Sequence, residues 1–231
     1  MPLIWTNDAA TANVAANGLG LINAVHFIVP APQFPGKNCN TASMNKYVVH
    51  GAYVPAWGVS ALISSPANII NMFINNHNLV AVALIASWGT MFRTAPHIWG
   101  KRNLADIDAA LNLCRHDIIA NGNIATAWEI LTNPAGNVRW SAVMASKTLH
   151  FLCRALGFNN DSPAALDNAV IRQRFWPAFR NLAVATGLPL PGNWNGNSYA
   201  AYLRYMTAIN IMATARGWTT TEMECTIFDQ Y

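Results

Sequence analysis

The residue with the strongest case for chemistry is Lys147, one of only four lysines in the chain. It follows Ser146, which is a good N-cap for a helix that Gly157 would end. If Ser146 is the N-cap, Lys147 is the first helical residue, where the positive end of the helix dipole opposes an ammonium charge. Apolar neighbours disfavour the charged form further. Both effects favour a neutral amine, which covalent catalysis by lysine requires.

The second candidate is Asp167, in the segment that follows. It comes directly after Ala165 and Leu166 and before an apolar-periodic run, so it is predicted to be an N-cap carboxylate at the start of another helix. A cap alone would stabilise that helix by roughly 1 kcal/mol. An acid and a lysine, each at a helix N-terminus, also form a candidate catalytic pair.

The distribution of charge points to the same segment. The chain has 14 Lys and Arg against 10 Asp and Glu, a net charge of +4. Six basic and two acidic residues lie between Arg139 and Arg180, so this segment carries the whole surplus and is where an anionic partner would bind. With 53% hydrophobic and only 10% charged residues, the composition excludes an intrinsically disordered chain and a polybasic tail.

The elements that must position Lys147 and Asp167 are predicted to be helices. Apolar residues recur at helical spacing, strand signals are almost absent after Ala56, and cap residues mark several helix ends. We therefore expect an all-α fold. Apart from the helices that start at Ser146 and Asp167, the predicted helices are 104 to about 121, 124–131, 199–216 after an N-cap at Ser198, and 220–229 with a Thr219–Glu222 capping box.

Several classes of protein and site are disfavoured. The best apolar stretch, residues 79–92, is shorter than the ~20 residues that cross a bilayer, so we expect no membrane partner. The N-terminus lacks the basic start of a signal peptide, which predicts an intracellular, cytoplasmic and nucleoid-associated protein rather than a secreted one. We expect no metal and no cofactor, because the cysteines are too far apart for a zinc or iron–sulfur site and are predicted to be reduced, mostly buried thiols: Cys39, Cys114, Cys153 and Cys225.

In their context these residues resemble a known family. Ser146-Lys147 entering a helix, followed about twenty residues later by Ala165-Leu166-Asp167 and Val170, is similar to the 8-oxoguanine DNA glycosylase-like family of the helix-hairpin-helix superfamily. The resemblance covers roughly residues 80–231, since further segments follow the order expected for that family: Trp88-Gly89, 104–118, 127–131 and the C-terminal stretch 199–228.

The resemblance implies a two-lobed helical fold with a DNA groove between the lobes. It implies a single glycosylase-like domain over residues 1–231. The expected parts are an irregular N-terminal segment over 1–55, a helical lobe over 56–135, and the hairpin, catalytic segment and C-terminal helices over 136–231.

The implied activity is that of a DNA glycosylase with associated lyase activity. Lys147 would attack the anomeric carbon of the deoxyribose, expel the base and form a Schiff base, after which β-elimination nicks the strand. Asp167 would stay ionised, help to deprotonate the lysine and stabilise the cationic sugar. The partner would be double-stranded DNA with a modified base, 8-oxoguanine in the first place, flipped out of the stack. No obligate protein partner is implied.

Other residues are candidates for the base pocket and the DNA backbone. Phe151, one helical turn after Lys147, would face the same pocket and stack on the flipped base, with His150 beside it. The hairpin before Lys147 would hold phosphate through backbone amides and a helix N-terminus. The candidates for backbone contact are Arg139, Ser146, Arg172 and Arg174.

Two departures from the family pattern leave the excised base open. The superfamily hairpin usually carries glycines, whereas residues 141–145 read SAVMA, and Ala169 stands where eukaryotic-type 8-oxoguanine enzymes have a histidine. A bulky or hypermodified base, such as one in phage DNA, is therefore an alternative substrate, with a role in defence. A non-catalytic helix-hairpin-helix module that only binds DNA and a protein–protein scaffold are the alternatives from other classes.

Overall fold

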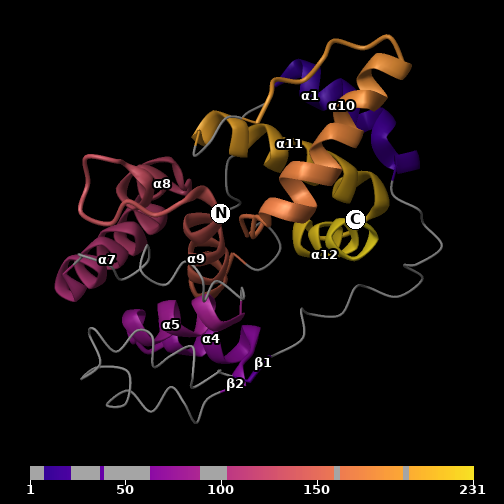
Figure 1. The fold of residues 1–231 in the computed structure, drawn as a ribbon. Helices are drawn as coiled ribbons and strands as arrows, with labels where there is room; N and C mark the ends of the chain where they lie inside the picture. The colour runs from indigo at the N-terminus through magenta and orange to yellow at the C-terminus, as the bar shows by residue number, and fades with distance from the viewer. Residues whose placement is uncertain (1–7, 22–36, 39–62, 89–102, 159–161, 195–197) are drawn as a thin grey trace. The chain divides into compact units, whose positions relative to one another are not determined.

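The computed structural model of the chain describes residues 8–21, 37–38, 63–88, 103–158, 162–194 and 198–231. Within them the regular secondary structure is helical (Figure 1), apart from an antiparallel pair of two-residue strands, β1 (Lys37–Asn38) and β2 (Ile63–Ser64). The predicted all-α class is confirmed. Two compact units make up the chain: the Lys147 unit, Phe34–Gly157, and the Asp167 unit, Met1–Gln33 with Phe158–Tyr231.

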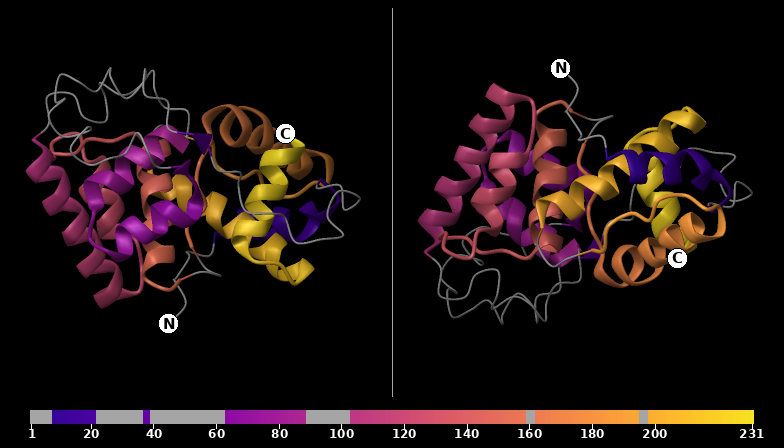
Figure 2. Two further views of the ribbon diagram at one scale, coloured as in Figure 1. Left: turned by 90° about the horizontal axis from the view of Figure 1, so that it is seen from below. Right: turned by 90° about the horizontal axis from the view of Figure 1, so that it is seen from above.

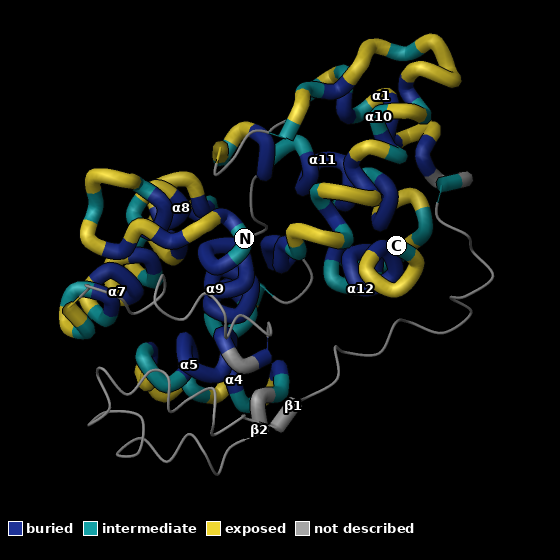
Figure 3. The backbone as a smooth tube through the Cα atoms, in the orientation of Figure 1, coloured by how far each residue is buried: buried dark blue, intermediate teal, exposed yellow. Residues whose placement is uncertain are grey.

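The Lys147 unit is organised around its last helix. That helix is α9, and α4, α5 and α8 pack against it, while α7 packs against α5 and α8 (Figure 2). Residues 144–153 of α9 are all buried, as the dark tube of Figure 3 shows. The bounds of the five helices are α4 (Pro66–Ile74), α5 (Asn78–Trp88), α7 (Leu104–Asn121), α8 (Ala125–Thr132) and α9 (Ala142–Ala155).

Helix α5 contains most of the apolar stretch 79–92, which the sequence offered as the best candidate for a membrane segment. Residues 81–86 are apolar and buried, so this part of the stretch is a core helix of the unit. No helix among the described residues is long and apolar enough to cross a membrane. At its start, the Asn78 side-chain amide donates to Asp108 Oδ1 and Asn112 Oδ1, both at 3.0 Å, which fixes α5 on α7.

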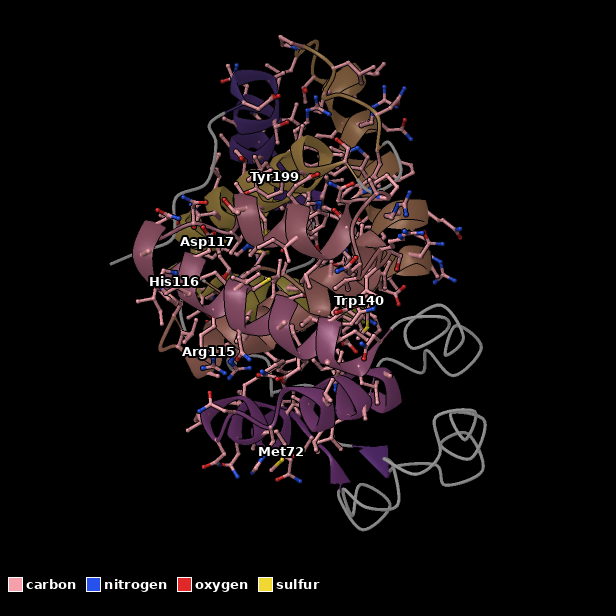
Figure 4. All side chains as sticks on the ribbon, turned by 90° about the vertical axis from the view of Figure 1, so that its left-hand side faces the viewer. Met72, Arg115, His116, Asp117, Trp140 and Tyr199 are labelled. Atoms are coloured by element: carbon pink, nitrogen blue, oxygen red, sulfur yellow. The ribbon has the colours of Figure 1, made fainter. Side chains whose placement is uncertain are left out.

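Helix α7 is also fixed to α4. The Arg115 guanidinium donates through Nη2 to the carbonyl oxygen of Phe73 at 2.6 Å, in the last turn of α4. A cation is favourable there because it complements the negative end of the helix dipole. Burial lowers the pKa of Arg115. Figure 4 labels Arg115, His116 and Asp117 along α7, and Met72 on α4.

The Asp167 unit is organised around its longest helix, α11 (Tyr199–Arg216). Helices α1 and α12 pack against α11, and α10 packs against α1 and η6 (Figure 1). Element η6 is a π-helix that runs directly into α10. The remaining bounds are α1 (Ala9–Asn17), η1 (Gly18–Leu21, a 3₁₀-helix), η6 (Asn168–Phe175), α10 (Trp176–Ala185) and α12 (Thr220–Gln230).

Most of the predicted helix ends are confirmed. Gly122 and Gly217 end α7 and α11 in the left-handed conformation, with φ of 62° and 70°. Ser198 caps α11 by accepting a hydrogen bond from the backbone of Ala201. Thr219 and Glu222 form the reciprocal capping box of α12. These signals are local, so the sequence alone sufficed to find them.

The N-terminal segment differs from the predicted irregular structure, because residues 9–17 form α1. Asp8 is its N-cap and accepts from the backbone N–H of Thr11 at 2.8 Å. The same carboxylate pairs with the Arg204 guanidinium of α11 at 3.3 Å. The sequence of α1 has only a weak apolar pattern, and contacts with α11, distant in the chain, stabilise it.

Helix α9 begins one turn earlier than predicted. Its N-cap is Ser141, whose Oγ accepts from the backbone N–H of Met144 at 3.3 Å. Ser146 is therefore not the N-cap; it lies inside the helix and donates to the carbonyl oxygen of Val143 at 3.1 Å. The later start was expected because Ser146 is of the same cap-forming residue type as Ser141 and is also followed by apolar residues at helical spacing.

The cap assignment predicts different effects for two serines. Replacing Ser141→Ala should lower the free energy of unfolding by about 1 kcal/mol, since it leaves an N-terminal backbone N–H without its acceptor. Ser146→Ala should cost less, because that hydroxyl bonds a carbonyl that the helix already uses. Denaturant unfolding of both variants measures the difference. A larger loss for Ser146→Ala would contradict the assignment.

Candidate active site

Lys147 lies on the second helix of a hairpin formed by α8, a turn and α9. The turn starts at Asn133, whose side-chain oxygen accepts from the backbone N–H of Ala135 at 2.8 Å. It closes where the backbone N–H of Trp140 donates to the carbonyl oxygen of Leu131 at 2.7 Å. Trp140, labelled in Figure 4, is 1% exposed and anchors the end of the turn.

The turn of this hairpin lies earlier than residues 141–145, which the sequence suggested. Residues 142–145 form the first turn of α9, and the connection before them contains a glycine, Gly136. A Cβ at Gly136 would stand 3.2 Å from the carbonyl oxygen of Asn133, so the turn is tight where the glycine occurs. The connection between the two helices therefore does contain a glycine, and residues 141–145, which lack one, are not the turn.

The position of Lys147 in α9 changes the case for its reactivity. Helix α9 begins at Ala142, so Lys147 is its sixth residue and not its first. The helix dipole acts mainly within the first turn, so it contributes little at Lys147. Burial remains as a cause: Lys147 is 5% exposed, and removal from water disfavours the charged form of an amine.

One aromatic ring lies beside the Lys147 amine, and a second ring packs against the first. Its Nζ lies 5.4 Å from the centroid of the Trp88 ring, at the end of α5. Phe151 meets the same indole edge-to-face, with ring centroids 5.2 Å apart and planes at 87°. Lys147 and Phe151, one turn apart on α9, are therefore joined through Trp88. In the sequence, Trp88 is part of the family resemblance but has no expected role at the site.

His150 belongs to the same helix and is fully buried. Its ring packs edge-to-face on Phe151 with centroids 4.8 Å apart. The hydroxyl of Thr148, next to Lys147, is also buried, and in the described part of the chain it has no hydrogen-bond partner. Polar groups are thus concentrated in the buried middle of α9.

Asp167 is the N-cap of η6, as predicted. Its Oδ1 accepts from the backbone N–H groups of Ala169 at 2.8 Å and Val170 at 2.9 Å. Both bonds use one carboxylate oxygen, which leaves Oδ2 for another partner. The carboxylate is partly exposed at the start of the helix.

An extended segment before Asp167 holds it in place. Residues 162–166 are buried without being helical. The Tyr202 hydroxyl donates to the carbonyl oxygen of Ala164 at 2.8 Å, and Thr220 Oγ1 donates to that of Ser162 at 3.3 Å. Helices α11 and α12 therefore fix the backbone that ends in Asp167.

Two buried polar groups of this unit, Tyr205 and Glu224, were not expected from the sequence. Burial, with the nearby charges of Glu224, Cys225 and Asp167, raises the pKa of Tyr205 well above its ordinary value. Glu224 is 1% exposed. A signal existed in the sequence, since Glu224 falls on the buried stripe of α12 formed by Thr220, Met223 and Ile227.

The arginine candidates for DNA contact have different surroundings. Arg139 is exposed in the hairpin turn with a φ of 53°, and its Nε donates to the carbonyl oxygen of Gly136 at 2.6 Å. Arg172 stacks on Trp194 at 5.8 Å from the ring centroid, and Arg174 donates to the carbonyl oxygen of Tyr231. In this structure both arginines of η6 thus contact the protein itself.

The candidate residues divide between the two units. The Lys147 unit holds Arg139, Ser146, Lys147, His150 and Phe151, and the Asp167 unit holds Asp167, Arg172 and Arg174. The structure brings Lys147 and Phe151 together on α9. The pairing of Lys147 with Asp167 and the expected single glycosylase-like domain stay predictions.

The cysteines are buried where the structure describes them. Cys114, Cys153 and Cys225 lie in the cores of their units, and none of the three forms a disulfide; Cys39 lies outside the described residues. Burial raises the pKa of Cys114 to about 12, and that of Cys153 is raised as well. Such thiols are weak nucleophiles near neutral pH. Among the described residues, no three His, Cys, Asp or Glu side chains gather as metal ligands.

The cap at Asp167 predicts how its variants affect stability. Asp167→Ala should lower the free energy of unfolding by about 1 kcal/mol, because two backbone N–H groups lose their acceptor. Asp167→Asn should be close to neutral, since asparagine caps helices equally well. Denaturant unfolding of the two variants tests this. Equal losses would show that the charge, not the cap, stabilises η6.

The chain was compared with protein-family models, curated proteins and solved structures. No protein-family model matches the chain, and no curated protein or solved structure is significantly similar to it. The function must therefore be argued from the residues and their geometry.

Proposed function

We propose that the chain is a DNA glycosylase with associated lyase activity that excises a modified base from double-stranded DNA through Lys147. The observation that carries the proposal is the buried amine of Lys147 on the second helix of a hairpin, beside Trp88 and Phe151. A primary amine is the nucleophile such a reaction needs, and aromatic rings supply faces on which a flipped base can stack.

The proposed reaction has two parts. The neutral Lys147 Nζ attacks the anomeric carbon, the glycosidic bond breaks, and the base leaves with the bonding electron pair. The attached amine loses a proton, and the ring oxygen leaves the anomeric carbon with its electron pair and takes up a proton, which gives a Schiff base. β-Elimination then removes a C2′ proton and breaks the C3′–O bond, so that the 3′ phosphate leaves. The target nucleotide must first leave the stack, because its anomeric carbon cannot be reached within the duplex.

Asp167 is proposed to assist as a carboxylate. The hydrogen bonds from Ala169 and Val170 hold its Oδ1, and Oδ2 is left to accept a proton or to face a cationic sugar. The proposed role uses the carboxylate of Asp167 in its ionised form.

The hairpin is proposed to bind a phosphate next to the flipped nucleotide. The first turn of α9 has backbone N–H groups without acceptors within the helix, and the helix dipole favours an anion there. Ser141 and Arg139 are exposed at this end, whereas Ser146 is buried and bonded to Val143. We therefore assign the backbone contact to Ser141 and Arg139 in place of Ser146.

The proposed substrate is 8-oxoguanine in duplex DNA, and such an enzyme would act on the nucleoid, in the cytoplasm. The resemblance supports this base, and the rings of Trp88, Phe151 and His150 support a planar one. A bulky or hypermodified base would use the same chemistry on the same residues.

The nucleophile is tested by borohydride trapping on a duplex that contains 8-oxoguanine. The wild-type protein should form a covalent adduct, because borohydride reduces the Schiff base, and Lys147→Gln should form none. Lys101→Gln serves as the control and should trap normally. A covalent adduct with Lys147→Gln would overturn the assignment of Lys147.

The same assay separates the alternatives. Trapping on a duplex with a glucosylated hydroxymethyl base, but not on 8-oxoguanine, would identify a hypermodified base as the substrate. Binding without product on every duplex would indicate a non-catalytic module. A scaffold for proteins would bind none of the duplexes, whereas phosphate contacts give binding that weakens steeply with salt.

The role of Asp167 is tested by single-turnover base release. Asp167→Asn keeps the helix cap and removes the charge, so base release should slow by about 10² to 10⁴-fold, the usual contribution of general acid–base catalysis. Binding to the duplex, measured by fluorescence anisotropy, should change little. A loss of binding as large as the loss of rate would instead indicate a structural role.

A further inference from the structure

The ammonium of Lys147 has an aromatic partner within its own unit. Its Nζ lies over the Trp88 ring at 5.4 Å from the centroid, inside the ~6 Å range of cation–π attraction. Lys147 is 5% and Trp88 7% exposed, so the contact is shielded from water. Cation–π attraction is strongest at such desolvated sites, and tryptophan is its best ring.

The helices that pack against α9 bring few charges to this place. Helices α4 and α5 contain no charged residue, and α8 contains only Glu129, which is exposed. On α9 itself the charged or titratable residues besides Lys147 are His150, Cys153 and Arg154. Among these helices, α5 offers the amine an aromatic face, that of Trp88.

The indole itself is held by packing. Trp88 ends α5, whose first residue, Asn78, is hydrogen-bonded to α7. Phe151 meets the indole at 87°, so the ring is braced by the same helix that carries the lysine. A ring fixed in this way can define where the end of a long, flexible side chain lies.

We propose that Trp88 is a positioning residue that holds the Lys147 amine, as an ammonium, over its indole face in the DNA-free protein. This inference rests on the proposed function only where it treats Lys147 as a nucleophile. A cation–π contact favours the ammonium and so opposes the effect of burial. The free protein thus keeps the amine in place but protonated, and the proton must leave before attack.

The contact is tested by NMR of the full chain labelled with ¹³C at the lysine Cε. Only four signals arise, and Lys147→Arg identifies that of Lys147. In the wild type, the ring current of the indole should shift the Lys147 Hε protons upfield. In Trp88→Leu this shift should disappear, and the titration midpoint of Lys147 should fall by about 0.5 to 1.5 pH units, because the ammonium loses its attraction.

A conservative variant and a matched control complete the experiment. Trp88→Phe keeps a weaker ring, so its shift and midpoint should lie between those of wild type and Trp88→Leu, and it remains informative if Trp88→Leu fails to fold. Trp218 stacks on Arg216 at 5.0 Å in the other unit, and Trp218→Leu should leave the Lys147 signal unchanged. An unchanged or higher titration midpoint of Lys147 in Trp88→Leu would overturn the proposal. If Trp88→Leu does not fold, the same result in Trp88→Phe would overturn it.

The trapping assay distinguishes this inference from the proposed function. With Trp88→Leu, the pH at which trapping is half-maximal should fall together with the NMR midpoint. If Lys147→Gln still traps while the NMR signal depends on Trp88, the proposed function fails and the positioning role stands. If trapping requires Lys147 but the NMR signal of Lys147 is the same in the Trp88 variants as in the wild type, the positioning role fails and the proposed function stands.

Discussion

The burial of α9 is the constraint on which the Lys147 unit depends. Ten consecutive residues of this helix are buried, and they include Ser146, Lys147, Thr148 and His150 along with apolar side chains. Removing an amine and hydroxyls from water costs free energy unless new partners compensate. The Ser146 hydroxyl is compensated by its bond to the carbonyl oxygen of Val143, and the Lys147 amine by the face of the Trp88 ring.

The packing around α9 decides how that cost is met. Helices α4 and α5 contribute apolar side chains without a single charge, and the ring of Trp88 provides the face over which the amine lies. The low content of charged residues in the chain, 10%, is in part a consequence of such a core.

The Asp167 unit solves a different problem, the exact placement of one carboxylate. The buried segment 162–166 lacks helical hydrogen bonds, and the hydroxyls of Tyr202 and Thr220 supply donors to it. Asp167 then caps η6 through two backbone N–H groups, so its position is defined from both sides. Tyr205 and Glu224 place further polar groups in the buried interior of this unit.

The sequence by itself determined the all-α class, the helices with strong periodicity, and the caps at Asp167, Ser198 and Thr219, because these depend on residues close together in the chain. It also singled out Lys147. Only the tertiary structure decided that α9 starts after Ser141, that α1 exists, and that the Lys147 amine lies over Trp88. Helix α1 and the Trp88 contact depend on elements far apart in sequence, such as Asp8 with Arg204, which no local pattern encodes. The start of α9 depends on a local cap, but Ser141 and Ser146 are both of a residue type that caps helices, and the sequence alone did not distinguish them.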